Sequence, residues 1–199
     1  MLGSVDFDSE EIDGQVNVAI RPRQPGSSIK PLTYLAAFER GWTPSTMLMD
    51  VKQSFPDGAN PPYVPVNYDG KEFGPVSLRA ALAGSRNIPA VATLNEIGLP
   101  ALLEVAQRMG IRSLTRQDYG LSLTLGGGEV TLLEMTGAYA SFANQGYRLE
   151  PRAILYITDQ QGRVIVPDSE PVLTRIMDPR HAYWISDILS DNAARTPAF

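Results

Sequence analysis

A serine and a lysine three residues apart, Ser27 and Lys30, form a pair that could carry out nucleophilic chemistry. On a helix this spacing places both side chains on one face. The lysine amine would then lie ~3 Å from the serine hydroxyl, or one water away, and could take its proton. Pro25-Gly26 indicates a turn before the pair, and Pro31 cannot donate a backbone hydrogen bond to the carbonyl of Ser27. Ser27 is therefore expected at or just before the first turn of a helix, where unpaired N–H groups favour a developing anion.

The S-x-x-K spacing is weakly specific by itself, because a chain of this size contains about one such pair by chance. A structural interpretation stays open at this point, in which Ser27 and Ser28 cap the helix and Lys30 is solvated. It would be the better interpretation if no other motif accompanied the pair. The apolar run over residues 32–38 predicts a helix that is buried on nearly all sides.

Ser85-Arg86-Asn87 is the second candidate element. It lies between two predicted short helices, one capped by Ser77 and one that starts near Pro89. In such a turn a serine hydroxyl can pass on a proton, and an asparagine amide can hold a substrate carbonyl. The literal Ser190-Asp191-Asn192 is a rival, but we interpret it as the end of a long C-terminal helix with no helix capped immediately after it.

The elements around these motifs indicate an α+β architecture, with strands at the ends and helices between. Extended segments are predicted over residues 1–7 and 15–20, and a β-hairpin is predicted over residues 153–166. Further helices are predicted over residues 99–109, 131–144, where Thr131 and Glu134 form a capping box, and 178–189.

Two segments rich in proline or glycine are predicted to lack regular structure. Residues 41–74 are predicted to form a long connection made mostly of loops, which we call the 41–74 crossing. Loops of this length usually line a site. The Gly126-Gly127-Gly128 run is interpreted as a flexible turn, because no G-x-x-x-x-G-K-[ST] phosphate motif is present.

Composition narrows the function classes. The chain has 199 residues, which suits one domain, and its net charge of −5 without a basic cluster argues against nucleic acid as a partner. It has no cysteine and a single histidine, His181, which we interpret as an ordinary helix residue, so no metal or other cofactor is expected. No apolar run approaches the ~20 residues of a membrane span, and no signal peptide is visible.

Three segments together resemble the transpeptidase domain of class A penicillin-binding proteins: Q-P-G-S-S-I-K-P at residues 24–31, S-R-N-I-P-A at 85–90 and L-T-L-G-G-G-E-V-T at 123–131. The resemblance extends over nearly the whole chain. It implies the penicillin-binding protein/β-lactamase-like fold, an antiparallel sheet flanked by helices. Residues 1–199 would form part of one transpeptidase domain, with residues 75–145 approximately its helical subdomain.

The resemblance also implies a role for each motif residue. Ser27 would be the acylated nucleophile, Lys30 its proton acceptor, Ser85 a proton relay and Asn87 the residue that orients the donor peptide. The implied reaction is attack on the D-Ala-D-Ala amide of a peptidoglycan stem peptide, release of the last D-Ala, and transfer to a neighbouring amine. β-Lactams would trap Ser27. This chemistry requires that burial or a nearby cation lower the pKa of Lys30.

The sequence departs from the family pattern because it contains no K-T-G motif; Arg195-Thr196-Pro197 resembles it only superficially, since proline lacks the backbone donor. We therefore expect a fragment that is marginally stable and poorly active alone. Its parent is expected to be a bacterial protein anchored at the extracytoplasmic face of the cytoplasmic membrane, with a glycosyltransferase domain. Two alternatives stay open. One is a non-catalytic remnant or binding scaffold. The other is a serine β-lactamase or D,D-carboxypeptidase, which needs an efficient base for deacylation, and no recognisable motif places a glutamate for that role.

Overall fold

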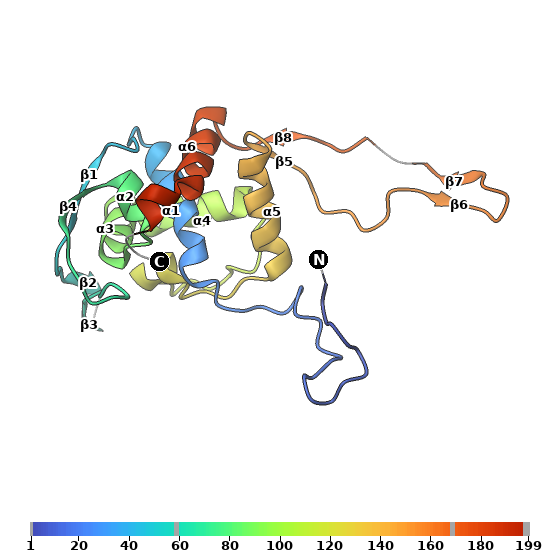
Figure 1. The fold of residues 1–199 in the computed structure, drawn as a ribbon, viewed down its shortest axis with the longest axis horizontal. Coiled ribbons are helices and arrows are strands. Elements are labelled where there is room, and N and C mark those ends of the chain that lie inside the picture. The colour runs from blue at the N-terminus through green and yellow to red at the C-terminus, as the bar shows by residue number, and fades with distance from the viewer. Residues whose placement is uncertain (1, 58–59, 168–169, 197–199) are drawn as a thin grey trace.

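The computed structural model describes residues 2–57, 60–167 and 170–196, and it shows helices gathered around one central helix, α1 (Figure 1). The helices are α1 (Lys30–Phe38), α2 (Leu78–Ala83), α3 (Asn87–Ile97), α4 (Leu99–Arg108), α5 (Leu132–Ala143), α6 (Pro179–Ser190) and α7 (Asn192–Arg195), with 3-10 turns η1 (Gly26–Ile29) and η2 (Leu121–Leu125). The strands are β1 (Met47–Asp50), β2 (Phe55–Asp57), β3 (Asn60–Tyr63), β4 (Gly74–Ser77), β5 (Tyr147–Arg148), β6 (Ile157–Thr158), β7 (Val164–Val166) and β8 (Thr174–Arg175).

The strands pair in short antiparallel sheets, β1 with β4, β2 with β3, β5 with β8, and β6 with β7. Helices and antiparallel strands together confirm the predicted α+β class. The segment from residue 78 to 143 holds α2 to α5 and η2. The division of the chain at residues 75–145 stays a prediction.

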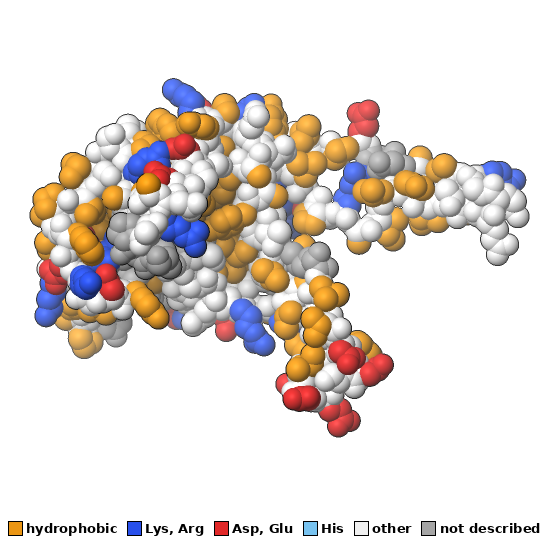
Figure 2. Space-filling view, viewed as in Figure 1, with side chains coloured by type: hydrophobic (Ala, Val, Ile, Leu, Met, Phe, Trp, Pro, Cys, Tyr) orange, Lys and Arg blue, Asp and Glu red, His pale blue; other side chains and the backbone are white. Residues whose placement is uncertain are grey.

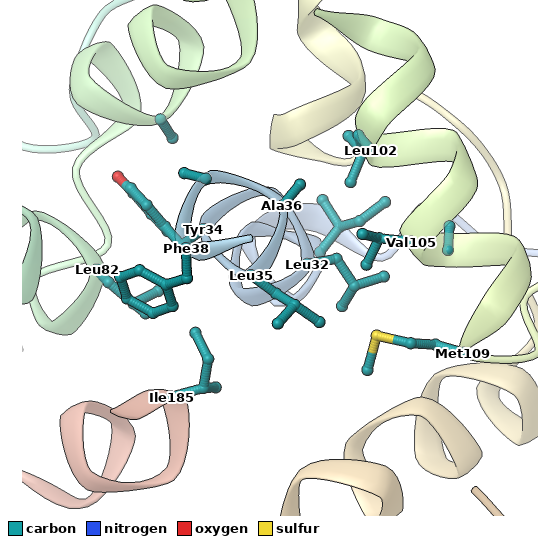
Figure 3. Close-up of a cluster of buried hydrophobic side chains, with 14 of the residues drawn as sticks. Leu32, Tyr34, Leu35, Ala36, Phe38, Leu82, Leu102, Val105, Met109 and Ile185 are labelled. Carbon is teal, nitrogen blue, oxygen red and sulfur yellow. The ribbon is translucent and has the colours of Figure 1, made fainter. Parts of the chain in front are cut away.

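Helix α1 forms the centre of the core. Each of its residues is buried, which confirms the predicted all-round burial. Figure 3 shows Leu32 and Leu35 of α1 facing Val105 of α4 and Met109, which directly follows α4, with Ile185 of α6 on another side. Apolar burial of this extent leaves α1 no freedom to shift without exposing core surface. The residues at its N-terminal end, where the candidate nucleophile lies, are therefore held firmly.

The helix start differs slightly from the sequence prediction, because a 3-10 turn precedes α1. The N–H of Lys30 donates to the carbonyl of Ser27, three residues back. Pro31 occupies the first turn of α1 and has no N–H for the same carbonyl. The turn over residues 26–29 is therefore tighter than an α-helix, and Ser27 lies within it.

Other local predictions are confirmed. The side chain of Ser77 accepts from the N–H of Ala80 and caps α2. Thr131 and Glu134 form both hydrogen bonds of a capping box at the start of α5. Helix α6 follows an Asp178 cap, and the predicted hairpin is formed by β6 and β7.

Three of the sequence predictions are wrong. Within residues 2–7 and 15–20 the backbone forms bends and turns instead of strands. The N–H of Ile20 bonds to the carbonyl three residues back, that of Asn17, a single bond from Val18 to Gly3 links the two segments, and no neighbouring strand pairs with either segment. Residues 41–74 are not a plain loop, since they contain β1 to β3 and the first residue of β4, whose pairing joins positions far apart in sequence. Helix α6 ends at Ser190, as predicted, but the expectation that no capped helix comes next is wrong: α7 begins at Asn192, and the Asp191 carboxylate caps it by accepting from the N–H of Ala194.

Two segments project from the helical body, the β6–β7 hairpin and the N-terminal segment (Figures 1 and 2). Apolar side chains of the hairpin are exposed, among them Ile157, Val164 and Ile165. Among the described residues no single helix has the length and apolar character to cross a membrane, and α3 with α4 meets those criteria only as a pair bent by 95°.

Candidate active site

The structure brings the four predicted site residues together. Ser27 is exposed in η1 and lines two cavities. Lys30 and Ser85 share the first cavity with it, of about 370 Å³. Ser85 and Asn87 share the second, of about 390 Å³. Both motifs therefore border the space next to the Ser27 hydroxyl.

The ammonium of Lys30 is held by the second motif. Its Nζ donates to the carbonyl oxygen of Ser85 at 2.6 Å, to the Ser85 hydroxyl at 3.2 Å and to Oδ1 of Asn87 at 2.7 Å. Among the described residues the Ser27 hydroxyl makes no hydrogen bond to Lys30, so the predicted direct contact is not formed. Ser27 lies in the 3-10 turn ahead of α1, and catalytic hydrogen bonds are often formed only once substrate is bound.

The surroundings of Lys30 lower its basicity. The residue is only 1% exposed, and this burial lowers the pKa of Lys30 to about 7, with the Arg86 guanidinium acting in the same direction. At neutral pH about half of the Lys30 side chains are then uncharged amines. A neutral amine beside a serine is able to accept the proton of an attacking hydroxyl.

The turn that carries Ser85 is strained. Ser85 has φ +50°, a left-handed conformation that costs free energy for a residue other than glycine. The turn is closed by backbone hydrogen bonds from Ser85 to Leu82 and from Arg86 to Ala81. This conformation lets both the carbonyl and the hydroxyl of Ser85 reach Lys30.

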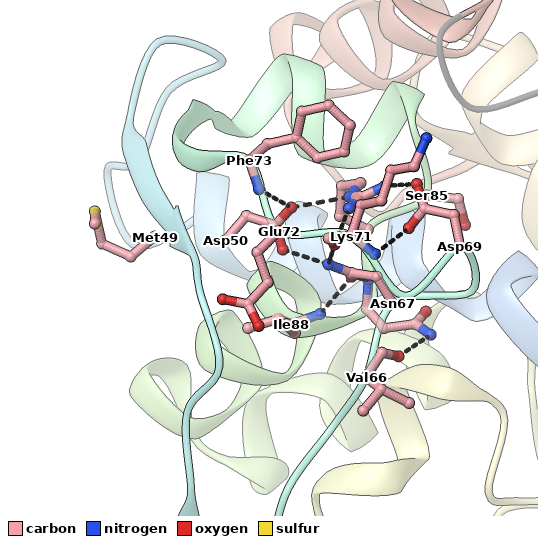
Figure 4. A network of polar contacts seen from close by, with 12 residues as sticks. Met49, Asp50, Val66, Asn67, Asp69, Lys71, Glu72, Phe73, Ser85 and Ile88 are labelled. Carbon is pink, nitrogen blue, oxygen red and sulfur yellow. Dashed lines mark hydrogen bonds and ion pairs between the residues drawn. The ribbon is translucent and has the colours of Figure 1, made fainter.

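A polar network behind this turn was missed by the sequence analysis (Figure 4). Oδ1 of Asn67 accepts from the N–H of Asn87 at 2.8 Å and of Ile88 at 3.2 Å. Its amide nitrogen donates to Oδ1 of Asp50 at 2.6 Å. Asp50 and Asn67 both belong to the 41–74 crossing, whose length was the only sequence signal that it lines a site.

A close backbone contact positions η1 from the other side. Gly126 has φ +92°, and a Cβ there would lie 2.3 Å from the backbone nitrogen of Gly26, the residue before Ser27. A buried hydrogen bond of 2.7 Å between Thr33 and Thr124 joins α1 to η2. The glycine run that we interpreted as a flexible turn is therefore a tightly packed one, which only glycine allows at residue 126.

Tyr139 of α5 is a further residue at the site. Its hydroxyl donates to the carbonyl of Ser28 at 2.8 Å, and it lines the first cavity beside Ser27. Burial raises the pKa of Tyr139 to about 12, so the phenol stays a neutral donor at physiological pH. The tyrosine therefore braces the turn that carries Ser27.

The rival motif serves structural purposes. Asp191 caps α7 and pairs with Arg79 at 3.0 Å, and the Ser190 hydroxyl donates to the carbonyl of Asp187 at 3.1 Å. Ser190 lines neither of the cavities that Ser27 borders. The geometry favours Ser85-Arg86-Asn87 as the second motif of the site.

Comparison with known proteins identifies the family. Residues 3–196 match the model of the penicillin binding protein transpeptidase domain. The chain belongs to this family. Its resemblance to class A penicillin-binding proteins is confirmed by curated relatives: it is 36% identical over 199 residues to penicillin-binding protein 1A of Neisseria meningitidis, and 42% identical over 166 residues to that of Aquifex aeolicus.

These relatives are much longer than the chain. The alignment with the Neisseria protein covers 96% of this chain and 24% of that protein. The alignment with the Aquifex protein covers 81% of this chain and 22% of that protein. The chain therefore spans about a quarter of the length of these relatives.

Solved structures confirm the predicted transpeptidase fold. The crystal structure of penicillin-binding protein 1A from Haemophilus influenzae is similar with a TM-score of 0.83 and 29% identity, covering 92% of this chain and 31% of that one. Penicillin-binding protein A from Mycobacterium tuberculosis, in an imipenem acyl-enzyme complex, has a TM-score of 0.81 over 97% of this chain and 48% of its own. At 20% identity, this second likeness bears on the fold alone.

Proposed function

We propose that this penicillin-binding transpeptidase chain carries the catalytic serine of a D,D-transpeptidase that cross-links peptidoglycan stem peptides. The observation that supports the proposal most is the buried Lys30, whose pKa is lowered to about 7 beside an exposed serine. A solvated lysine would be almost wholly protonated at neutral pH and could not serve as a base.

In the proposed reaction the hydroxyl oxygen of Ser27 attacks the carbonyl carbon between the two D-Ala residues, while its proton moves to neutral Lys30. The C–N bond then breaks, and the leaving amine of the terminal D-Ala takes a proton from Lys30 through the Ser85 hydroxyl. An ester on Ser27 remains. The amine of a second stem peptide attacks this ester and gives a proton to Lys30. The new amide forms as the ester C–O bond breaks, and Lys30 passes the proton to the Ser27 oxygen, so that the hydroxyl and the neutral amine are both restored.

Asn87 is proposed to orient the donor peptide. Its Oδ1 is engaged with Lys30, and its Nδ2 donates to the carbonyl of Val66 at 2.8 Å. These bonds fix the amide in the lining of the second cavity, which Ser27 also lines. A peptide in this cavity would lie between the nucleophile and the amide.

The whole protein is proposed to work at the extracytoplasmic face of the bacterial cytoplasmic membrane, anchored there and joined to a glycosyltransferase domain. β-Lactams, which mimic D-Ala-D-Ala, are proposed to acylate Ser27. The match of residues 3–196 to the penicillin binding protein transpeptidase domain supports this expectation.

Labelling of the intact protein with a fluorescent penicillin tests the proposal. Ser27→Ala should abolish the label while leaving the thermal unfolding transition in place. Ser85→Ala should slow labelling by about 10²-fold, the usual scale for loss of a proton-transfer group. Ser190→Ala is the matched control and should label at the normal rate.

Each other outcome has a defined meaning. A label on the Ser27→Ala protein, mapped to another serine, would end the assignment of the nucleophile. Rapid loss of the label from wild type would support a β-lactamase or carboxypeptidase. Absence of any label on folded protein would support a non-catalytic scaffold.

A further inference from the structure

The side chain of Arg86 is buried and fully engaged behind the catalytic turn. It is 8% exposed, and it donates to Oδ2 of Asp50 at 2.9 Å, to Oδ2 of Asp69 at 2.9 Å and to the carbonyl of Lys71. Its guanidinium carbon lies 4.3 Å from the centre of the Phe73 ring. The N–H groups of the guanidinium thus join Asp50, Asp69 and Lys71, three residues of the 41–74 crossing.

Asp50 is the fixed end of this arrangement. It is 0% exposed at the last position of β1, where its oxygens accept from Arg86, from Asn67 and from the N–H of Phe73. Asn67 in turn accepts from the backbone of Asn87. Figure 4 shows Asp50 and Asn67 joined in one network beside Ser85. A continuous set of contacts therefore runs from β1 to the turn that holds Lys30.

A contribution to folding stability does not by itself explain the buried ion pair of Arg86 and Asp50. Desolvation of two charges commonly offsets their attraction, so that apolar residues of similar volume would serve the fold as well. Here the pair lies next to the strained φ of Ser85, and strain of this kind persists only where the surroundings enforce it. The location indicates a role in the site.

We propose that Arg86 and Asp50 are positioning residues: they hold the Ser85 turn in its strained form, with its carbonyl and hydroxyl on the Lys30 amine, and they fix a guanidinium next to that turn. The inference rests on the proposed function, in which Lys30 is the base. Arg86 acts on the chemistry through Lys30 and Ser85, because its guanidinium is already engaged with Asp50, Asp69 and Lys71.

The charged and titratable groups near Lys30 set the direction of the effect. Burial is the main reason that the pKa of Lys30 is lowered, and Arg86 lowers it further. Asp50 and Asp69 partly neutralise Arg86. The elements packed around Lys30 contribute the following groups: Arg86 from the Ser85 turn, Asp50 from β1, Asp69 from the 41–74 crossing, Tyr139 from α5 and Arg195 from α7.

Three variants of the intact protein separate positioning from charge. Arg86→Lys keeps the positive charge but loses the fork, so acylation should slow by about 10-fold or more while its pH midpoint stays near that of wild type. Arg86→Gln removes the charge, so the midpoint should move to higher pH. Asp50→Asn leaves Arg86 less neutralised, so the midpoint should move to lower pH. Arg116→Gln, at an exposed pair with Asp118, is the control and should behave as wild type.

Opposite shifts from the two partners of one ion pair cannot arise from unfolding, which would lower the rate of both at every pH. The same ordering should appear in a direct titration of the Lys30 side chain by ¹³C NMR, assigned by its loss in Lys30→Ala. This second readout does not require acylation. Unlabelled wild type would therefore refute the proposed function, whereas a Lys30 titration that is unmoved in Arg86→Gln and Asp50→Asn, or moved the same way in both, would refute the positioning role.

Discussion

Acylation of Ser27 should lose rate as the pH falls through about 7, because only the neutral amine of Lys30 accepts a proton. The pKa of Lys30 falls from 10.5 to about 7. At pH 7 roughly half of the lysine is then reactive, compared with about one part in 3,000 for a solvated lysine. This gain of about 10³ in available base corresponds to about 4 kcal/mol. The second-order rate constant should be about tenfold below its plateau at pH 6 and about a hundredfold below it at pH 5.

The assay is stopped-flow acylation by a fluorescent penicillin between pH 5 and 9 at constant ionic strength. Lys30→Arg keeps a positive charge that is not lost in this range, so its rate should be at least about 10²-fold lower and independent of pH. Lys52→Arg, at an exposed position, is the control and should retain the wild-type profile. A wild-type rate at pH 5 within about twofold of the rate at pH 8 would refute Lys30 as the base.

The same pKa predicts how stability depends on pH. Lys30 loses its proton more easily in the folded chain than in the unfolded chain, so between about pH 7 and 10.5 the unfolded state binds more protons. The contribution of Lys30 to stability therefore rises with pH in this window and is least favourable below pH 7. Lys30→Met should remove this rise, which the difference between urea unfolding curves of the two proteins would measure. Equal pH dependence of the two proteins would show that the pKa of Lys30 is not lowered.

Further predictions concern the elements that hold the site. Gly126→Ala should reduce both stability and acylation, since its Cβ would collide with Gly26, whereas Gly162→Ala, with φ +79° and open space around it, should carry only the cost of backbone strain; equal loss in both variants would argue against the contact. Leu35→Ala should cost about 2–5 kcal/mol in chemical denaturation, because the leucine is 0% exposed in the core, and a loss below about 1 kcal/mol would contradict that burial. Thr131→Ala should cost about 1 kcal/mol through loss of the capping box, and calorimetry showing an unchanged Tm would contradict that role.

The parts of this protein that the sequence determined by itself depend on residues three or four positions apart. The Ser77 cap, the Thr131–Glu134 capping box and the position of Ser27 just ahead of a buried helix all follow from local hydrogen bonds and apolar periodicity. The spacing of Ser27 and Lys30 also lies within one turn. Such features form wherever the local sequence allows them, so they could be predicted before any fold was known.

The tertiary structure alone decided what Lys30 can do. Its partner Ser85 lies 55 positions away in sequence, and Arg86 meets Asp50 across 36 positions. The strands of the 41–74 crossing escaped prediction for the same reason, since β1 exists only through pairing with β4. The pKa of Lys30 depends on the burial of its side chain and on nearby charges, both of which come from groups that folding brings together. The residues adjacent to Lys30 in sequence do not predict them. The S-x-x-K motif therefore indicated Ser27 and Lys30 as a candidate nucleophile and base, whereas the lowered pKa of Lys30 depends on the packed chain around it.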